Sequence, residues 1–135
     1  MSQANKDLVR KFFRILEDDW RIPEELLGDG FVYTVPGVPP MDVDALQERA
    51  AVFSAFSDAT RIEDDLIAEG DRVSFRSTLE WTHTGEFMGA AGTGERVSVV
   101  EMGFFRIADG KIAEMWGLLD TMGLLTQIGA LPNGA

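Results

Sequence analysis

The chain has 135 residues, no cysteine and a formal net charge of −11. An acidic surface repels phosphate backbones, so nucleic-acid binding is not expected, and the sequence has no run of Lys or Arg that would favour a membrane surface. The absence of cysteine excludes disulfides, thiolate nucleophiles and cysteine-ligated metal sites. No apolar stretch is as long as a membrane span and the N-terminus lacks the pattern of a signal peptide, which predicts a cytoplasmic protein.

Helices dominate the first part of the chain. Apolar residues recur every three or four positions over 5–20, which predicts an amphipathic helix with Asn5 as its N-cap. A short second helix is predicted over 24–27, and the β-forming residues of 31–35 predict a short strand. A third helix, over 42–56, is apolar on one side and should pack against a sheet.

The second half of the chain has the pattern of strands. Candidate strands cover 59–68, 72–84, 95–107 and 111–119, and a short helix is predicted over 121–128. The strand over 72–84 alternates cleanly between apolar and polar residues, which indicates one buried and one exposed face.

This order of helices followed by a meander of long strands predicts one α+β domain over residues 1–135, with a core of about 5–129. The expected architecture is a curved antiparallel sheet closed by helices around a single internal pocket. Residues 131–135 are expected to form a loose tail.

Asp120 is the first candidate for acid/base chemistry. If the last strand has no bulge, five of its residues share one face, namely Ile112, Glu114, Trp116, Leu118 and Asp120. If that face is the concave one, the Asp120 carboxylate lies in the pocket wall beside an indole and could transfer protons. Alternatively, Asp120 caps the helix that follows it, because Asp is a favoured N-cap residue. The spacing leaves both roles open.

His83 is the only histidine of the chain and shares a strand face with Leu79 and Trp81. An imidazole suits proton transfer near neutral pH, although a lone histidine more often has a structural role. A single histidine without cysteine is poor material for a metal site, so neither a metal nor a cofactor is expected.

Several segments resemble one known family. They are 55–58, 69–73, 81–89, 105–112, 114–120 and 123–129, which include the strings WTHTGEFMG, FRIADGKI and EMWGLLD. Together they resemble the SnoaL-like polyketide cyclase family over most of residues 5–129.

This resemblance implies the fold of nuclear transport factor 2 and ketosteroid isomerase, a cone of helices and a curved sheet that is frequently dimeric. Cyclases of the family close a ring by intramolecular aldol condensation without cofactor or metal. By the resemblance, Asp120 corresponds to their acid/base aspartate and His83 becomes a candidate pocket residue. The sequence departs from the family pattern at Tyr33, where many members have a histidine, and in the loop over 89–94.

The function expected from these features is that of a cofactor-free cyclase or a related lyase or isomerase. Asp120 would move the proton, and His83 or Tyr33 would hydrogen-bond the enolate. Further residues expected to bind a small apolar or aromatic, polyketide-like substrate are Trp81, Trp116, Phe104, Phe105 and Glu114.

Other functions fit the same fold. A ketosteroid-isomerase-like enzyme would need a carboxylate within 33–37, which has none, and an epoxide hydrolase would need an Asp-Arg-Asp set for which Arg76 has the wrong parity. A non-catalytic ligand-binding or dimerisation module needs only the apolar pocket. The outer face of the sheet, where Arg72, Arg76 and Glu80 alternate, is expected to form a homodimer.

Overall fold

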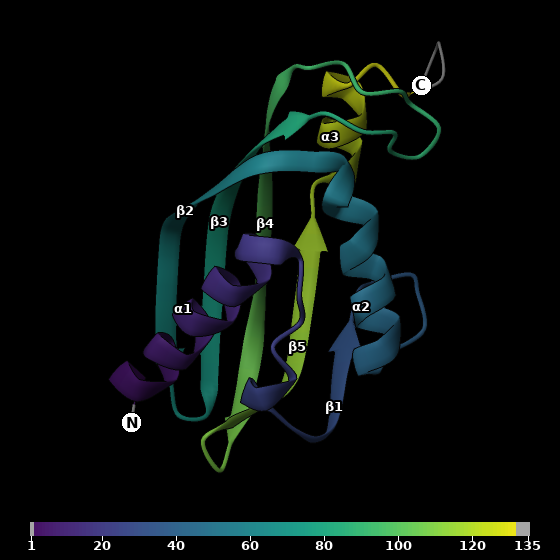
Figure 1. Cartoon of the computed structure of the whole chain (residues 1–135). Coiled ribbons are helices and arrows are strands. Elements are labelled where there is room, and N and C mark those ends of the chain that lie inside the picture. Colours follow the sequence, from purple (N-terminus) through teal and green to yellow (C-terminus); the bar gives the residue numbers. More distant parts are fainter. Residues whose placement is uncertain (1, 132–135) are drawn as a thin grey trace.

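The frame of the molecule is a curved five-stranded sheet, seen in a computed structural model that describes residues 2–131 (Figure 1). Its strands are β1 (Leu27–Thr34), β2 (Phe56–Glu69), β3 (Arg72–His83), β4 (Arg96–Ala108) and β5 (Lys111–Leu119). Their order is β1-β5-β4-β3-β2. The long strands β2 to β5 are antiparallel, but β1 pairs with β5 in parallel. The sheet is therefore mixed, which corrects the prediction of a purely antiparallel sheet.

Helices cover the concave face of this sheet. Helix α1 (Ser2–Asp19) crosses in front of β2, β3 and β4, and α2 (Val43–Val52) lies beside β1 and β5 (Figure 1). Helix α3 (Thr121–Gln127) packs at the far end of the sheet against β4. Two short 3₁₀ turns, Glu24–Leu26 and Phe53–Ala55, lead into β1 and β2. The predicted α+β class is confirmed, and none of the helices within residues 2–131 is long and apolar enough to cross a bilayer.

The element boundaries differ from the sequence prediction mainly at helix ends. Helix α1 begins at Ser2 and not after an Asn5 cap; the Asn5 side chain instead donates to the Gly70 carbonyl at 3.4 Å. The helix predicted over 42–56 ends at Val52, because Phe53 turns the chain toward β2. The predicted loose tail lies, apart from its first residue, outside the described residues.

The core consists of two aromatic clusters. Beneath α1, Phe12, Phe13, Phe75 and Phe105 pack mostly edge to face, with ring centroids 5.0 to 5.6 Å apart. At the α3 end a second cluster forms around Phe56, Trp81, Phe87 and Leu124. The apolar sides of α1 and α2 are buried toward the sheet, as the periodicity predicted.

A bulge in β5 decides which of its side chains face inward. Ile107 of β4 pairs with Ile112, but the next residue toward the start of β4, Arg106, pairs with Glu114, so Ala113 is an extra residue. After this bulge Met115, Gly117 and Leu119 face the helices, while Glu114 and Trp116 point outward. The sequence prediction required a strand without a bulge, and that condition is not met. Glu114, Trp116, Leu118 and Asp120 still share one face, but it is the outer one, and Ile112 lies on the opposite face.

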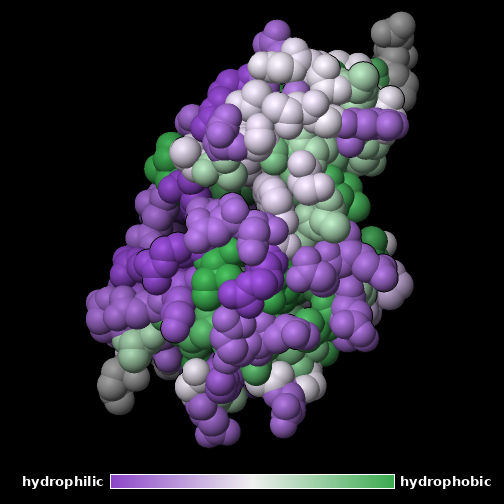
Figure 2. Space-filling view, in the orientation of Figure 1, coloured by the Kyte–Doolittle hydropathy of each residue, from purple (hydrophilic) through white to green (hydrophobic). Residues whose placement is uncertain are grey.

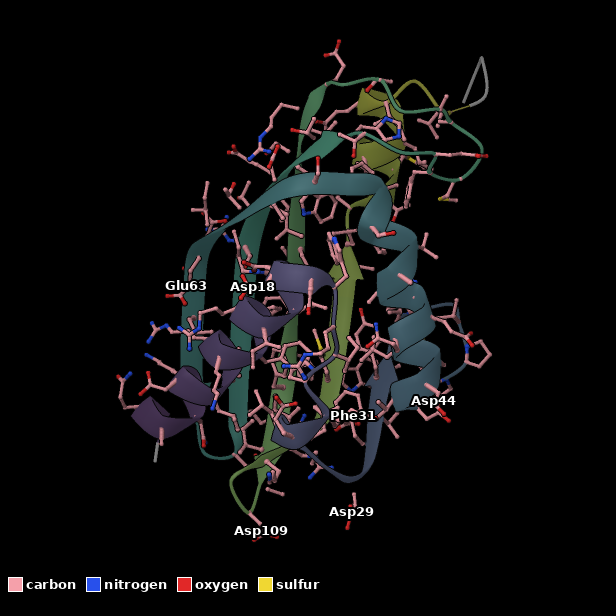
Figure 3. The ribbon with its side chains drawn as sticks, in the orientation of Figure 1. Asp18, Asp29, Phe31, Asp44, Glu63 and Asp109 are labelled. Carbon is pink, nitrogen blue, oxygen red and sulfur yellow. The ribbon has the colours of Figure 1, made fainter. Side chains whose placement is uncertain are left out.

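On the face seen in Figure 2, hydrophilic side chains cover most of the lower part, with apolar side chains visible between them, while the upper end is mostly of intermediate hydropathy. Charge pairs tie α1 to the sheet edge: Arg10 donates to Glu63 of β2 at 2.9 and 3.0 Å. Glu63 is labelled on β2 in Figure 3. Asp29 and Asp109, also labelled there, lie at the end of the molecule opposite α3.

Candidate active site

An internal cavity of about 80 Å³ lies between α1, α2 and the concave face of the sheet. Its walls are largely aromatic and aliphatic, formed by Phe12, Phe13, Leu16, Trp20, Phe53 and Trp81 among others. Five polar side chains also line it, those of Glu17, Tyr33, Arg49, Arg61 and Glu101. An apolar cavity with a few convergent polar groups is the usual form of a small-molecule site.

Arg61 of β2 holds two of these carboxylates together. Its Nε donates to Glu17 of α1, and its Nη2 donates to Glu101 Oε1 at 3.2 Å. The guanidinium also stacks on Phe13, with Cζ 3.7 Å from the ring centroid. The side chains of Arg61 and Glu101 are only 11% and 15% exposed, so the Glu101 charge depends on Arg61 for compensation, and Arg61 is compensated by Glu101 and Glu17. Arg61 Nη1 is buried and has no hydrogen-bond partner among the described residues.

The backbone of Tyr33 is fixed on both sides, by an isolated β-bridge and by strand β5. Its backbone exchanges hydrogen bonds of 2.9 and 2.8 Å with Met41, and it pairs with Met115 of β5. Burial raises the pKa of the Tyr33 hydroxyl, and the negative charge of Glu101 raises it further, while Arg49 opposes both effects. Tyr33 therefore remains protonated at neutral pH and presents a hydrogen-bond donor at the cavity.

The end of α1 closes one side of the cavity with an indole. Trp20 stacks on Phe53 and meets Trp81 edge to face, with centroids 6.3 and 6.0 Å away. Gln47 of α2 clamps this segment, because its amide donates to the Trp20 carbonyl and accepts from the Ile22 N–H, both at 2.9 Å. Sites for drug-sized ligands usually measure about 300–1,000 Å³, so a multi-ring ligand would have to displace this wall.

Asp120 lies outside the cavity. Its carboxylate accepts from the Gly123 N–H at 2.9 Å and caps α3, which confirms the capping role considered from the sequence. It is exposed and lines an outer groove with Val100, Met102 and Leu118. Leu119 and Arg49 line both this groove and the internal cavity.

His83 is also separate from the cavity. It is completely buried at the α3 end, where its ring lies 5.3 Å from that of Phe56. Its Nδ1 is held by Thr93, whose backbone N–H donates at 3.4 Å and whose hydroxyl lies at 3.2 Å. The predicted convergence of Asp120 and His83 in one pocket is therefore wrong: the β5 bulge turns Asp120 outward, and His83 belongs to the second aromatic cluster.

The remaining predicted residues divide between the two faces of the sheet. Tyr33 and Trp81 line the cavity, whereas Phe105 is fully buried in the core beneath it. Phe104 and Trp116 stack on each other on the outer face, with centroids 6.2 Å apart. Glu114 forms an ion pair with Arg106 at 3.3 Å.

Four charged residues that line the cavity were not predicted from the sequence: Glu17, Arg49, Arg61 and Glu101. A signal existed for Glu101, which is the only charged residue in the alternating row Val97, Val99, Glu101, Gly103 and Phe105. The others come from separate helices and strands, and only the folded chain shows that they meet.

The comparisons with known proteins agree with this architecture. The family model described as SnoaL-like polyketide cyclase matches residues 6–128. No curated protein matches the chain. AclR from Streptomyces galilaeus, for which a hydroxylase activity has been suggested, superposes with a TM-score of 0.88 at 27% identity, over 98% of this chain and 89% of that one.

Two further solved structures bear names that suggest cyclases. A protein from Jannaschia sp. CCS1, suggested to be a SnoaL-like polyketide cyclase, has a TM-score of 0.83 at 26% identity, over 97% of this chain and 95% of that one. IdmH from Streptomyces antibioticus, suggested to be a polyketide cyclase, has a TM-score of 0.81 at 26% identity, over 93% and 98% of the two chains. The chain belongs to the SnoaL-like polyketide cyclase family, and its fold is of the nuclear transport factor 2-like type.

Proposed function

We propose that the chain is a cofactor-free enzyme that closes a ring by intramolecular aldol condensation, or catalyses a related lyase or isomerase step, on a small apolar or aromatic, polyketide-like molecule. The observation that carries this proposal is the internal cavity, whose aromatic walls also include the largely buried Glu101 carboxylate and the buried Tyr33 phenol. Family membership supports chemistry on a small molecule.

The proton transfer is assigned to Glu101 and the enolate stabilisation to Tyr33. A carbon between two carbonyls is already acidic, so the Glu101 carboxylate can remove its proton while Tyr33 donates a hydrogen bond to the enolate oxygen. The enolate carbon then attacks the second carbonyl carbon, and the resulting alkoxide takes a proton back from Glu101. Of the two carboxylate oxygens of Glu101, Arg61 donates a hydrogen bond to Oε1, and Oε2 is left for this proton exchange.

Asp120 is the competing base, because the sequence resemblance assigns the acid/base role to it. The two assignments separate in Glu101→Gln and Asp120→Asn, each of which keeps the shape of the side chain. With an aromatic polyketide methyl ester as substrate, Glu101→Gln should lose about 10²–10⁴-fold in turnover. Asp120→Asn keeps a side chain that can cap α3 and should turn over at the parent rate.

The opposite result, loss in Asp120→Asn alone, would transfer the proton step to Asp120 and refute the interior assignment. Binding without turnover in the parent protein would favour the non-catalytic ligand-binding alternative.

The location of the ligand can be tested without turnover. The chain has three tryptophans, of which Trp20 and Trp81 line the cavity and Trp116 lies on the outer face. An aromatic ligand in the cavity should quench the fluorescence of the parent and of Trp116→Phe by similar absolute amounts. In Trp20→Phe the quenching should fall, and quenching lost only in Trp116→Phe would place the ligand outside.

A second candidate function is hydrolysis of an epoxide. The observation that favours it is Arg61, which bridges two carboxylates at the cavity, although the residues differ from the set considered in the sequence. One carboxylate would take a proton from water as the oxygen attacks an epoxide carbon, Tyr33 would give its proton to the opened oxygen, and the carboxylic acid so formed would return its proton to Tyr33. Formation of a diol from an aryl epoxide by the parent, and its loss in Arg61→Met, would support this activity over ring closure.

We also propose that two copies associate through the outer face of the sheet. This face exposes a contiguous row of large apolar side chains, including Trp116 at 38% and Leu118 at 53% exposure, next to Met102 and Phe104. Such a patch is unusual for a solvated sheet face. Light scattering at micromolar concentration should give twice the monomer mass, and Leu118→Glu should give the monomer; a monomeric parent refutes the dimer.

A further inference from the structure

Gly117 of β5 lies directly beneath the phenol of Tyr33. A Cβ atom built on Gly117 would lie 2.8 Å from Tyr33 Oη, 3.2 Å from Cε1 and 3.4 Å from Cζ, and these are its three nearest neighbours. Gly117 does not have a positive φ angle, so its backbone conformation is open to any residue. What this position requires is therefore space for the hydroxyl end of Tyr33.

The phenol cannot easily move away from a larger residue. The Tyr33 backbone is bonded to Met41 on one side and pairs with β5 on the other, and its side chain is buried among the core residues. The contact also differs from that of Gly103, the cross-strand partner of Gly117. A Cβ at Gly103 would lie 2.0 Å from the Trp116 carbonyl oxygen, so Gly103 serves backbone packing, whereas Gly117 is shaped to one side chain.

We propose that Gly117 is a positioning residue, whose missing side chain forms the seat that holds the Tyr33 hydroxyl at the cavity. The seat itself follows from the contacts above, and its effect on catalysis rests on the proposed function. Even an alanine must push the hydroxyl by several tenths of an ångström, because real Cβ atoms essentially never approach another heavy atom to 2.8 Å. A hydrogen-bond donor that stabilises an enolate acts only at the correct distance, so such a shift reduces the rate while leaving the donor present.

A substrate-free experiment tests the seat. Tyr33 is the only tyrosine of the chain, so the alkaline change in ultraviolet absorbance of tyrosinate reports on this one residue. Gly117→Ala should lower the midpoint of this titration toward that of free tyrosine, since the displaced phenol loses part of its burial. The matched control is Gly28→Ala on β1, where the new Cβ would make an ordinary 3.6 Å contact with Lys111, and its midpoint should equal that of the parent. A parental midpoint in Gly117→Ala would overturn the seat.

A double-mutant cycle tests the effect on catalysis. With the aromatic polyketide methyl ester, Tyr33→Phe should lose about 10²–10³-fold in kcat, and Gly117→Ala about 10-fold or more with little change in KM. The combined variant should be no slower than Tyr33→Phe alone, because the seat acts only through the hydroxyl. It should also regain thermal stability relative to Gly117→Ala, since the closest atom has been removed.

Two results would contradict the proposed effect of Gly117 on catalysis. If the losses of the two single variants multiply in the combined one, Gly117 acts by another route and the positioning role is wrong. If Gly117→Ala shifts the titration but Tyr33→Phe keeps the parental kcat, the seat stands and the catalytic role of Tyr33 in the proposed function fails.

Discussion

On β5, neighbouring residues serve opposite environments. Gly117 and Leu119 face the interior, where they meet Tyr33 and the cavity. Trp116, Leu118 and Asp120 face outward, where Leu118 lines one groove with Trp116 and a second groove with Asp120. The inner face carries buried charges and a phenol in fixed positions, and the outer face carries exposed apolar side chains and an acidic helix cap. The proposed chemistry and the proposed association of two copies therefore use opposite faces of the same strand.

One residue, Ala113, determines this assignment. Without its bulge, strict alternation from Ile112 would bring Trp116 and Asp120 to the cavity and turn Met115 and Gly117 outward. Position along the chain alone therefore does not reveal which carboxylate is near the substrate.

The largest expected effect comes from breaking this alternation beyond the bulge. Insertion of one alanine between Met115 and Trp116 would force the indole inward and Gly117 outward, so the free energy of unfolding should fall by more than about 4 kcal/mol. Deletion of Ala113 is the matched control, because the shortened strand alternates as Ile112, Glu114, Met115 with the same faces. Urea denaturation should show a folded deletion variant and an unfolded or severely destabilised insertion variant. Equal stability of the two would show that the alternation of Met115, Trp116 and Gly117 between the two faces does not determine how β5 packs.

The sequence predicted the parity of β3 but not that of β5, for a physical reason. On β3, apolar Val73, Phe75 and Leu79 alternate with polar residues, and the buried face follows directly. On β5 both rows contain apolar residues, so hydrophobic contrast does not distinguish them. The charged residues of the cavity could not be predicted from the sequence for another reason. Glu17 and Arg61 are far apart in the chain, and no periodic pattern indicates that their side chains are in contact.

A carboxylate introduced at a buried position should destabilise the protein far more than one introduced on the outer face of the sheet. Leu46 on α2 is 6% exposed and Leu118 on β5 is 53% exposed. Leu46→Asp buries an unpaired carboxylate and removes core contacts, which should cost more than about 3 kcal/mol. Leu118→Asp should cost less than about 1 kcal/mol in the free energy of unfolding of the monomer. Equal costs in urea denaturation would show that α2 does not bury its apolar side.

The two faces also offer matched carboxylate–arginine pairs. Glu101 pairs with Arg61, whose side chain is 11% exposed, and Glu114 pairs with the more exposed Arg106. Glu101→Gln should cost about 1–3 kcal/mol, because Arg61 then keeps only Glu17 as a charged partner. Glu114→Gln should cost less than about 1 kcal/mol, since solvent screens its pair. High salt should reduce the stability loss of Glu114→Gln and leave that of Glu101→Gln nearly unchanged. Thermal unfolding of each variant at two salt concentrations measures both losses.

The smallest effect is a loss of stability at high pH, and it concerns Tyr33 alone. Its folded-state pKa lies above the ordinary value of 10.0, chiefly because the phenol is buried and secondly because Glu101 is near. The folded chain therefore binds this proton more tightly than the unfolded chain does. The resulting stabilisation is complete below the ordinary pKa and is lost as the pH rises toward the folded one. The free energy of unfolding should thus fall more steeply above about pH 10 in the parent than in Tyr33→Phe, which has no phenolic proton to lose. Parallel pH profiles for the two proteins would mean that the phenol is as well solvated in the folded chain as in the unfolded one.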